Sequence, residues 1–570
     1  MRRVTDELSH VGKVALQPDK QNLYVPDRKS KEEEDSEHLQ MQLHQMHQYF
    51  DRGSTSGTEE EDSEHLQMQL HQMHQYFDRG STSGTAPERG VLSMEELVVT
   101  ERQDLFPEES STKLTEDLSG TNMYTLPDYI FGLVALQKLI LRSCAILMME
   151  LPREIGELKN LEVLDLEGTE ILRLPWEIEN LVKLTCLKVS FYGYANQQVI
   201  PRGVLSDLSR LKELIIDVTP YGEWWDVEVE AILDDLRNLK ELTTLKLYLP
   251  TFELLKYVTS IFPCLANFRF TVGRQEEHFI SRLPRDVEEE FNNWEKLEKG
   301  LKFINGDCIP NEITKVLKQA DAFFLQRHWT AESLSQFGHK NLNEVKFFLV
   351  MECNEFRTII DSEKLYQGKD GSAESEDFPG FDEAMVLGPL ERLIIRYMKN
   401  MESIWKGPVG NRSLSNLKSL ALHTCPNLTT LFTIDMLMNL INLEELIVED
   451  CPKINSLVSH TNSGSELVLF LPNLKKISLL WLPGLVSISS GLEIAPKLER
   501  MVIYYCPKLE KLSTVEVSSI ELKVIKGEKE WWDALKWYES DVSTKLEDYL
   551  ARHFIPLRRD EDQIAQLTKD

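Results

Sequence analysis

The spacing Leu-x-x-Leu-x-Leu, repeated along most of the chain, constrains the fold more than any other feature of the sequence. It occurs in twelve units, and adjacent regular units begin 23 to 31 residues apart. Val, Ile, Phe or Met replaces Leu in some units, which begin at Leu136, Leu161, Leu184, Leu211, Leu242, Leu265, Val345, Leu390, Leu417, Leu443, Leu474 and Leu498. Leu301 and Phe303 suggest a thirteenth unit. A recurring period of this length predicts stacked repeats rather than one globular core.

The spacing also predicts how each unit folds. Alternate residues of a strand point to opposite faces, so the aliphatic residues of the pattern point inward and stack on those of the neighbouring repeats. The residues between them face outward on a parallel sheet, and a return leg brings the chain back to the next strand. We therefore expect an α/β leucine-rich-repeat solenoid with a curved parallel sheet on its concave face and helical or irregular convex legs.

Two smaller motifs repeat in register with the leucines. Five cysteines stand eight residues after the first aliphatic position of their units: Cys144, Cys353, Cys425, Cys451 and Cys506. Repeats of this kind place Asn or Cys at the turn out of the strand, so we expect small buried thiols rather than metal or redox groups. Leu-Pro pairs at Leu126, Leu151 and Leu174 predict an extended turn into the return leg, because proline removes a hydrogen-bond donor and fixes φ.

The net charge and the distribution of apolar residues limit the classes of partner that we expect. The net charge of −30 repels phosphate backbones and anionic lipid, which argues against nucleic acid and membrane surfaces, although one repeat face could still carry a local basic patch. The sequence contains no run of eighteen apolar residues, so we expect no membrane span. The start of the sequence does not resemble a secretory signal, and the eight cysteines are scattered without a CxxC pair. A reducing, cytoplasmic compartment is therefore expected.

The amino-terminal residues differ from the repeats. Residues 1–90 form an acidic arm in which the 27 residues at 32–58 recur without a change at 59–85, and residues 91–125 form a linker. We expect the arm to be mostly disordered, although each copy carries a short helical stripe that could pair with the other copy or with a partner. Its histidines are interpreted as solvated rather than metal-binding, and no cofactor is expected.

The repeats themselves are assigned to residues 126–525. The pattern is irregular at 271–344, where Arg285–Phe303 and Glu312–His328 are helical in pattern, and an acidic insertion follows at 361–387. Long insertions are commonly functional or disordered, and we expect disorder here. Residues 526–570, with Trp531, Trp532 and Trp537, predict a helical segment that caps the last repeat, because an open end would expose apolar surface.

The outward positions of the strands form the candidate binding surface. A mixture of charge with Tyr and His suits selective protein recognition, whereas any single outward residue can be ordinary solvated surface. The candidates on the concave face are Arg142, Asp165, Glu167, Lys188, Asp217, Lys246, Tyr248, Arg396, His423, Glu449 and Tyr504.

The repeats resemble one family closely. The segment LPREIGELKNLEVLDLEGTEILRLPWEIENLVKLTCL (151–187) is similar to the repeats of plant nucleotide-binding leucine-rich-repeat (NLR) disease resistance proteins. The coiled-coil subclass fits best, because Cys-Pro-x-Leu follows the strands at Cys425, Cys506 and, with Ile as the last residue, Cys451. The closing Trp531-Trp532 pair is also similar to that subclass, and the resemblance covers about 400 residues.

The sequence departs from that family at the nucleotide-binding module. The phosphate loop GxxxxGK[ST] needs a Gly, a Lys and a hydroxyl side chain at fixed positions. The two Gly-Lys pairs, at Gly12 and Gly368, are followed by Val14 and Asp370 instead of Ser or Thr. We therefore do not expect nucleotide switching, and no GxSxG or HExxH motif predicts an enzyme.

These observations lead to one leading hypothesis and two alternatives. The resemblance implies a plant defence protein that recognises a pathogen effector, or a guarded host protein modified by one, with a full-length NLR as a further partner in trans. A leucine-rich-repeat adaptor that recruits substrates to a ubiquitin ligase or another complex is the second hypothesis. A nonfunctional receptor fragment is the third.

Overall fold

Contacts divide the chain into two compact units, Met1–Asp104 and Leu105–Asp570, and all residues described here lie in the second. The computed structural model describes residues 114–121, 126–144, 151–169, 171–191, 199–218, 224–259, 264–274, 298–363, 386–458, 470–489, 492, 494–512, 521–536 and 548–557. The acidic arm with its duplication, residues 285–297, Trp537 and most of the acidic insertion lie outside these ranges.

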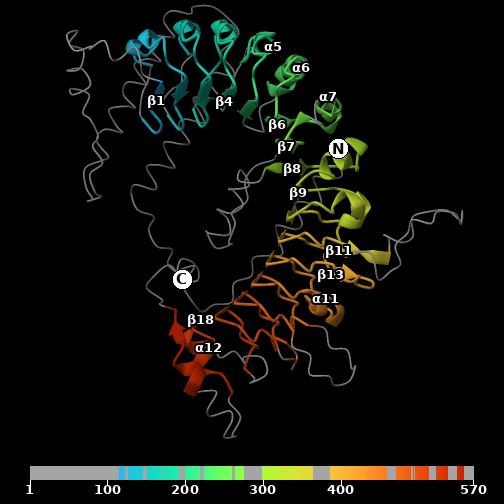
Figure 1. Cartoon of the computed structure of the whole chain (residues 1–570). Coiled ribbons are helices and arrows are strands. Elements are labelled where there is room, and N and C mark those ends of the chain that lie inside the picture. The colour runs from blue at the N-terminus through green and yellow to red at the C-terminus, as the bar shows by residue number, and fades with distance from the viewer. Residues whose placement is uncertain are drawn as a thin grey trace, which may run out of the picture. The chain divides into compact units, whose positions relative to one another are not determined.

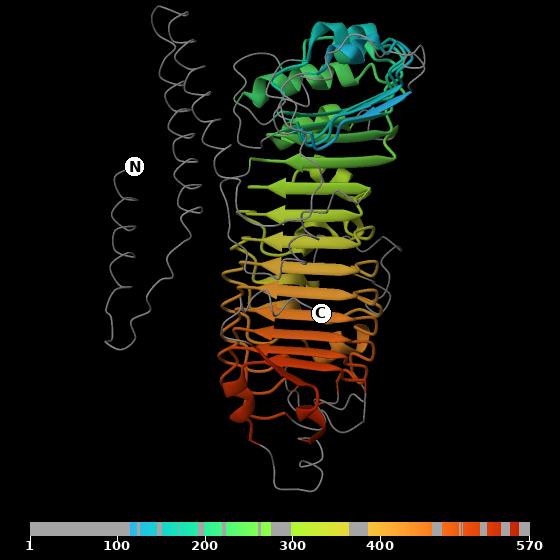
Figure 2. The same cartoon turned by 90° about the vertical axis from the view of Figure 1, so that its left-hand side faces the viewer.

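The described residues build one parallel sheet of 17 strands, each paired with the next strand of the sheet in chain order. Figures 1 and 2 show these strands stacked in a single row. The strands are β1 Thr115–Asp117, β2 Lys138–Ile140, β3 Val163–Leu166, β4 Cys186–Phe191, β5 Glu213–Val218, β6 Thr244–Leu249, β7 Asn267–Val272, β8 Lys299–Ile304, β9 Ala322–Gln326, β10 Phe347–Met351, β12 Arg392–Arg396, β14 Ser419–His423, β15 Glu445–Glu449, β16 Lys476–Leu480, β17 Arg500–Tyr504, β18 Val524–Gly527 and β19 Phe554–Pro556.

Each of the twelve predicted units contains one of these strands, which confirms the repeat fold. The suggested thirteenth unit is strand β8, and the sheet continues beyond 126–525 at both ends through β1 and β19. Helices α5, α6, α7 and α11 lie on one side of the strands in Figure 1. The residues of the Leu pattern point to that side and form one continuous core; Leu420 and Leu446, for example, are at most 1% exposed.

The helical prediction for Glu312–His328 was wrong in its second half. The helical prediction for Arg285–Phe303 was also wrong at its end, because residues 299–303 form most of strand β8. Helix α9 spans Asn311–Leu317, but Ala322–Gln326 is strand β9. The five residues of β9 are buried on both faces of the sheet, so the strand shows no alternation of apolar and polar residues. The sequence of β9 therefore lacks the alternation by which a half-buried strand is recognised.

The return legs are short and mostly irregular. The prolines at 127, 152 and 175 have extended ψ angles of 138°, 146° and 157°, and each precedes a 3₁₀ helix, as the Leu-Pro pairs predicted. These helices are η2 Asp128–Gly132, η3 Arg153–Glu157 and η4 Trp176–Asn180. Later legs contain α5 Val204–Asp207, α6 Trp225–Leu236, η5 Phe252–Leu254, α7 Leu255–Val258, η8 Leu334–Phe337, η9 His339–Asn341 and α11 Ile434–Asn439. Two legs pair as a small parallel sheet of β11 Thr358–Asp361 and β13 Ser403–Lys406.

The five cysteines in register are small buried groups, as the sequence predicted. All five are at most 1% exposed, and the thiols of Cys451 and Cys353 lie 3.3 Å and 3.5 Å from the carbonyl oxygens of Glu449 and Met351. The residue before each cysteine has a φ between 51° and 57°, so the chain turns sharply there and places the thiol beneath the strand carbonyls.

His328 takes the cysteine position of its repeat, because it stands two residues after Gln326 as Cys353 stands two after Met351. Its ring lies 3.1 Å from the carbonyl oxygen of Cys308 through Nε2, and Nδ1 accepts a hydrogen bond from the Ala331 N–H. Burial lowers the pKa of His328. A neutral ring with both nitrogens engaged is therefore part of the turn.

The residues just before strands β9 to β18 form a row of alternating charge, here called the pre-strand row. In chain order the row reads Asp321, Lys346, Glu391, Lys418, Glu444, Lys475, Glu499 and Lys523. Lys346 lies 3.5 Å from Asp321, and the Glu391–Lys418 and Glu444–Lys475 pairs are both 2.8 Å long. Lys523 pairs with Glu499 in the same way. Neighbouring repeats therefore attract each other along this edge, by the modest amount that exposed ion pairs allow.

The carboxyl-terminal residues cover the last repeats and add the last strand of the described sheet. Helix α12 Lys529–Asp533 holds Trp531, which is 8% exposed and donates a hydrogen bond from Nε1 to the Leu509 carbonyl oxygen over 2.9 Å. Trp532 stacks on Phe554 of β19 with ring centroids 4.2 Å apart. The tryptophan pair thus covers apolar surface at the last repeats, and β19 adds one more strand after it.

Replacing one stacked leucine should cost much of the stability of the repeats. Leu420 is 1% exposed in the middle of the core, so Leu420→Ala should lower the free energy of unfolding by about 2–5 kcal/mol through lost packing and a cavity. Urea denaturation followed by circular dichroism measures this loss. Ser419→Ala, on the other face of the same strand, should cost less than about 1 kcal/mol, and equal losses from both variants would contradict the assigned faces.

The burial of the cysteines predicts a simple labelling pattern. Cys264 and Cys308 are exposed, whereas the other six of the eight cysteines are buried. Burial raises the pKa of the Cys353 and Cys506 thiols to about 12, which suppresses the reactive thiolate. A chromogenic disulfide reagent should titrate two thiols in the native chain at neutral pH and all eight in concentrated urea. Rapid labelling of Cys353 or Cys506 in the native chain, located by peptide mass spectrometry, would contradict the burial of these thiols.

Candidate protein-binding surface

The face of the 17-stranded sheet opposite the core is here called the open face. Residues at equivalent positions of neighbouring strands lie side by side on it, because all the strands pair in parallel register. Arg396, His423, Glu449 and Tyr504, four of the candidates from the sequence, belong to one such row, with Leu480 between the last two. The structure therefore brings distant sequence positions together as the repeat pattern predicted.

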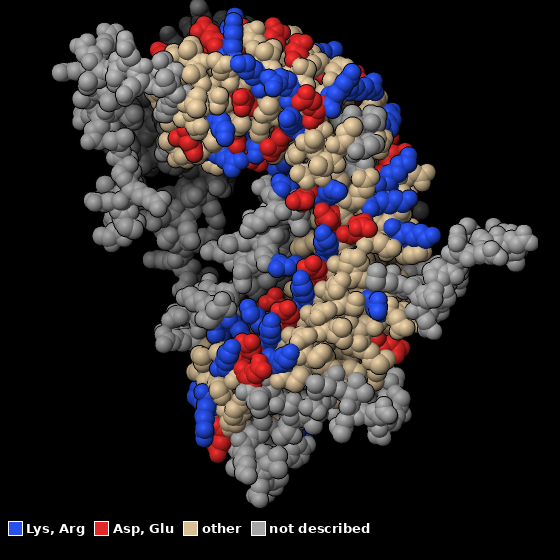
Figure 3. Space-filling model, viewed as in Figure 1, with Lys and Arg blue, Asp and Glu red and all other residues tan. Residues whose placement is uncertain are grey.

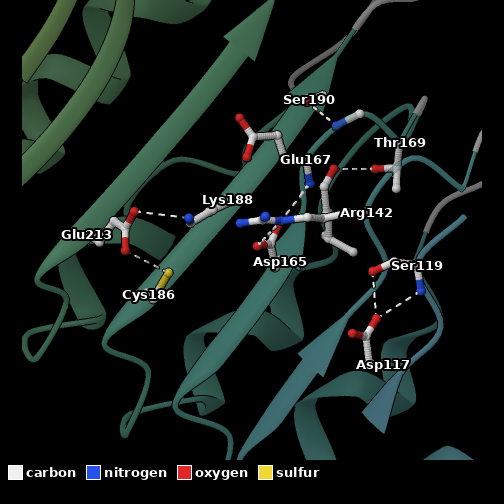
Figure 4. Close-up of polar contacts among 12 residues, drawn as sticks. Asp117, Ser119, Arg142, Asp165, Glu167, Thr169, Cys186, Lys188, Ser190 and Glu213 are labelled. Atoms are coloured by element: carbon white, nitrogen blue, oxygen red, sulfur yellow. Dashed lines mark hydrogen bonds and ion pairs between the residues drawn. The ribbon is translucent and has the colours of Figure 1, made fainter. Parts of the chain in front are cut away.

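A network of ion pairs lies on the open face of the first strands. Arg142 Nε is 2.7 Å from Asp165 Oδ2, and Asp165 Oδ1 also accepts a hydrogen bond from the backbone N–H of Glu167. Lys188 is the register partner of Asp165 on the next strand, and its Nζ lies 3.1 Å from Glu213 Oε1. Figure 4 shows these side chains on neighbouring strands.

Lys246 extends this network across β6. Its Nζ lies 3.8 Å from Glu167 Oε1 and 3.6 Å from Asp217 Oδ2, so one cation is shared by two carboxylates from different repeats. We call the following seven residues the amino-terminal charge cluster: Arg142, Asp165, Glu167, Lys188, Glu213, Asp217 and Lys246. Six of them were candidates from the sequence, and Glu213 was missed.

Cys186 lies beside this cluster on β4. Its thiol donates a hydrogen bond to Glu213 Oε2 over 3.3 Å, and burial together with the Glu213 charge raises its pKa to about 12. The group is therefore a hydrogen-bond donor to the cluster rather than a nucleophile.

Tyr248, another candidate from the sequence, is only 5% exposed and packs with the core. Its backbone carbonyl accepts a hydrogen bond from Trp225 Nε1 of helix α6 over 2.9 Å. Burial raises the pKa of its hydroxyl to about 12. The ring therefore contributes to packing more than to a surface that a partner could contact.

The later candidates differ in their exposure. Glu449, His423 and Arg396 are 0%, 1% and 7% exposed, and His423 Nε2 lies 3.5 Å from Glu449 Oε1. The Tyr397 ring lies 4.9 Å from His423 and 5.7 Å from the Arg396 guanidinium. These three candidates form a buried polar row, whereas Tyr504 is partly exposed.

The middle of the open face is apolar, which the sequence analysis did not foresee. Seven side chains from five neighbouring strands form this strip and are at most 6% exposed: Ala322, Phe324, Phe347, Leu349, Ile394, Ala421 and Ile447. The Phe324 and Phe347 rings stack with centroids 5.3 Å apart. The adjacent phenylalanines in AFFLQ (322–326) and KFFLV (346–350) were the available signal, because one ring of each pair must point away from the core.

Neither a metal site nor a membrane span is found among the described residues. No three His, Cys, Asp or Glu side chains are arranged there to hold a metal ion. No helix in the same ranges has the length and apolar character needed to cross a bilayer.

The ion pairs of the amino-terminal charge cluster should contribute little to folding. The Arg142 side chain is 49% exposed, so solvent screens its attraction to Asp165. A double-mutant cycle with Arg142→Ala and Asp165→Ala should give a coupling energy below about 1 kcal/mol in urea denaturation. A coupling above about 2 kcal/mol would mean that the pair is needed for the fold and is not available to a partner.

These repeats are similar in sequence to those of known proteins. Residues 116–270 match a family described as a leucine-rich repeat region, and residues 325–452 match one described as plant disease resistance protein RPS2-like, leucine-rich repeats. A disease resistance protein of Arabidopsis thaliana is 26% identical over 473 residues, which cover 79% of this chain and 43% of that protein. The chain thus spans less than half the length of this relative.

Two solved structures are also similar. One is the functional domain of InlJ from Listeria monocytogenes, which includes a cysteine ladder; it has a TM-score of 0.38 and 14% identity, and the match covers 78% of this chain and 73% of that one. The other is a leucine-rich-repeat protein of Leptospira interrogans, with a TM-score of 0.31, 13% identity, and coverage of 82% and 100%.

The strands in register, the buried cysteine turns and the matched residues lead to one conclusion. The described part of this chain folds as leucine-rich repeats, and its sequence is similar to the repeats of plant disease resistance proteins.

Proposed function

We propose that this chain acts in plant defence inside the cell, where the open face of its repeats binds a pathogen effector or a host protein modified by one. The repeats would act by recognition rather than catalysis. A full-length nucleotide-binding receptor is a further candidate partner in trans, because the repeats are similar to those of disease resistance proteins.

The observation that carries the proposal is the amino-terminal charge cluster on the open face. It sets three cations, Arg142, Lys188 and Lys246, among carboxylates from neighbouring repeats. A partner with complementary charges could exchange these intramolecular pairs for intermolecular ones, and such exchange favours specificity over raw affinity. The similarity to disease resistance repeats supports a role of the recognition in defence.

The thiols support an intracellular site of action. All eight cysteines are free, and two of them are exposed. An oxidising compartment favours disulfides, whereas free thiols persist where glutathione and thioredoxin keep them reduced.

The proposal is tested by removing the three cations of the cluster and comparing the captured proteins. Tagged wild type and Arg142→Ala/Lys188→Ala/Lys246→Ala are expressed in infected and uninfected plant tissue, and co-purified proteins are quantified by mass spectrometry. We expect a partner enriched in infected tissue, with recovery reduced about tenfold in the triple variant, because the cations lie at the centre of the cluster.

The matched control removes three cations from the return legs of the first repeats. Arg153→Ala/Lys159→Ala/Lys183→Ala changes the net charge equally at exposed positions, and it should leave recovery unchanged. Equal losses from both triple variants would contradict recognition by the open face. Recovery of ubiquitin-ligase core subunits from both infected and uninfected tissue would favour the adaptor hypothesis instead.

A further inference from the structure

Three exposed cations lie close together where strands β5 and β6 begin. Arg210 and Lys212 are exposed on either side of Leu211, which is buried in the core. The Lys212 carbonyl oxygen accepts a hydrogen bond from the Thr243 N–H over 2.9 Å, which places the start of β6 directly beside Lys212. Lys240 is also exposed and stands three residues before Thr243. These three cations, here called the basic edge patch, therefore lie on two neighbouring repeats.

Backbone hydrogen bonds fix how the two repeats align at the patch. The carbonyl oxygens of Leu208 and Leu239 accept the bonds that close their return legs, so these two leucines take equivalent positions. Lys240 follows Leu239 as Ser209 follows Leu208, so Lys240 lies beside Ser209, and Arg210 is the next residue. Equivalent residues of neighbouring repeats are about 4.7–4.9 Å apart in a parallel sheet, so the three charges share a small area.

Lys212 occupies the position of the pre-strand row, but its neighbours at that position are uncharged. Thr185 and Thr243 lie on either side of it, joined to it by backbone hydrogen bonds of 2.8 Å and 2.9 Å. Their hydroxyl groups donate to the carbonyl oxygens of Glu162 and Lys212. In the later repeats each lysine of the pre-strand row pairs with a carboxylate of the same row. Lys212 has no such carboxylate beside it.

The carboxylates near the patch form no ion pairs with it. Glu213, the residue after Lys212, pairs with Lys188 over 3.1 Å. Asp207 and Glu241 are exposed on the same legs. Neither lies at ion-pair distance from the patch, and no other carboxylate among the residues that the structure describes does so. The three cations are therefore solvated and accessible to a partner.

Further cations lie on the legs around helices α6 and α7. The Arg237 guanidinium and the Lys256 ammonium lie over the Tyr257 ring, 5.1 Å and 4.7 Å from its centroid. Arg237 also pairs with Asp234 over 3.4 Å, and both side chains are more than half exposed. Figure 3 shows Lys and Arg side chains close together on the upper right, where Figure 1 labels α6 and α7. These legs thus present several cations on a chain whose net charge is −30.

We propose that the basic edge patch binds a short acidic segment of a partner protein, in which two or three carboxylates lie on one face. Glu residues at positions i and i+4 of a helix have Cβ atoms about 5–6 Å apart, which matches the spacing of cations on neighbouring repeats. Arg210 can hold one carboxylate with two parallel hydrogen bonds, and the lysines act as point charges. The inference goes beyond the proposed function, because it concerns a second surface at the edge of the sheet.

The size of the patch favours a short protein segment over nucleic acid. Charges farther apart than about 8 Å are largely screened at physiological ionic strength, so three local cations attract a few carboxylates although the chain as a whole is acidic. A phosphate backbone extends beyond the patch and meets the surrounding carboxylates, such as Asp207 and Glu241.

The test uses the full chain and a defined probe. A fluorescein-labelled, alanine-based helical peptide with glutamates at positions i, i+4 and i+7 is titrated with wild type, and fluorescence anisotropy is measured. Binding should weaken when NaCl is raised, because salt screens exposed charges. Arg210→Ala/Lys212→Ala/Lys240→Ala should weaken binding by about fivefold or more, because three exposed charge pairs are lost. The same peptide with glutamine in place of glutamate should not bind.

The matched control removes three exposed cations from other repeats. Lys138→Ala/Lys159→Ala/Lys508→Ala changes the net charge equally and should change binding of the glutamate peptide by less than about twofold. Circular dichroism and the urea midpoint show that each variant is folded before it is compared.

Three outcomes would overturn the inference. These are no salt-sensitive binding of the glutamate peptide, an equal loss in the two triple variants, and tighter binding of a single-stranded oligonucleotide that the Arg210→Ala/Lys212→Ala/Lys240→Ala variant loses. Each is distinct from failure of the proposed function, because capture of a partner from infected tissue is tested on the amino-terminal charge cluster, which both triple variants leave unchanged.

Discussion

The stacking of inward aliphatic side chains from one repeat on those of the next is the constraint on which the rest of the structure depends. No strand can bury its apolar face alone, so each repeat is held by its two neighbours. Because the stacking fixes parallel register, it also fixes which residues meet on the opposite face. The core at Leu420 and the surface at Ser419 are consequences of the same alternation.

The open face changes in character along the sheet while its backbone stays the same. Its first strands carry balanced ion pairs, its middle strands carry a buried apolar strip, and its last strands carry adjacent cations beside aromatic rings. A repeat fold permits this variation, because outward residues contribute little to the core and can differ from repeat to repeat. Different parts of one sheet thus differ in charge and polarity on the same face, and the apolar strip in its middle is buried.

Much of this could be predicted from the sequence, because the leucine spacing sets the phase of every regular strand. The phase placed Arg396, His423 and Glu449 in one row, as the register confirms. It could not show that His423 and Glu449 are buried, since that depends on side chains such as Tyr397 that meet them only in the fold. Strand β9 and the apolar strip were missed because apolar residues on both faces hide the alternation. The phase could not show that Tyr248 is only 5% exposed, because burial depends on contacts that form only in the fold.

The pre-strand row has a consequence for how such a chain can change its length. From Asp321 to Lys523 the sign of the charge reverses at every repeat, so the loss or gain of one repeat by recombination would set two like charges beside each other. Loss or gain of two repeats would keep the alternation. Each pair of like charges at this exposed edge would cost only about 0.2–1 kcal/mol. This cost disfavours the gain or loss of a single repeat but does not prevent it. Along this edge a change of two repeats preserves the alternating charges, whereas a change of one repeat does not.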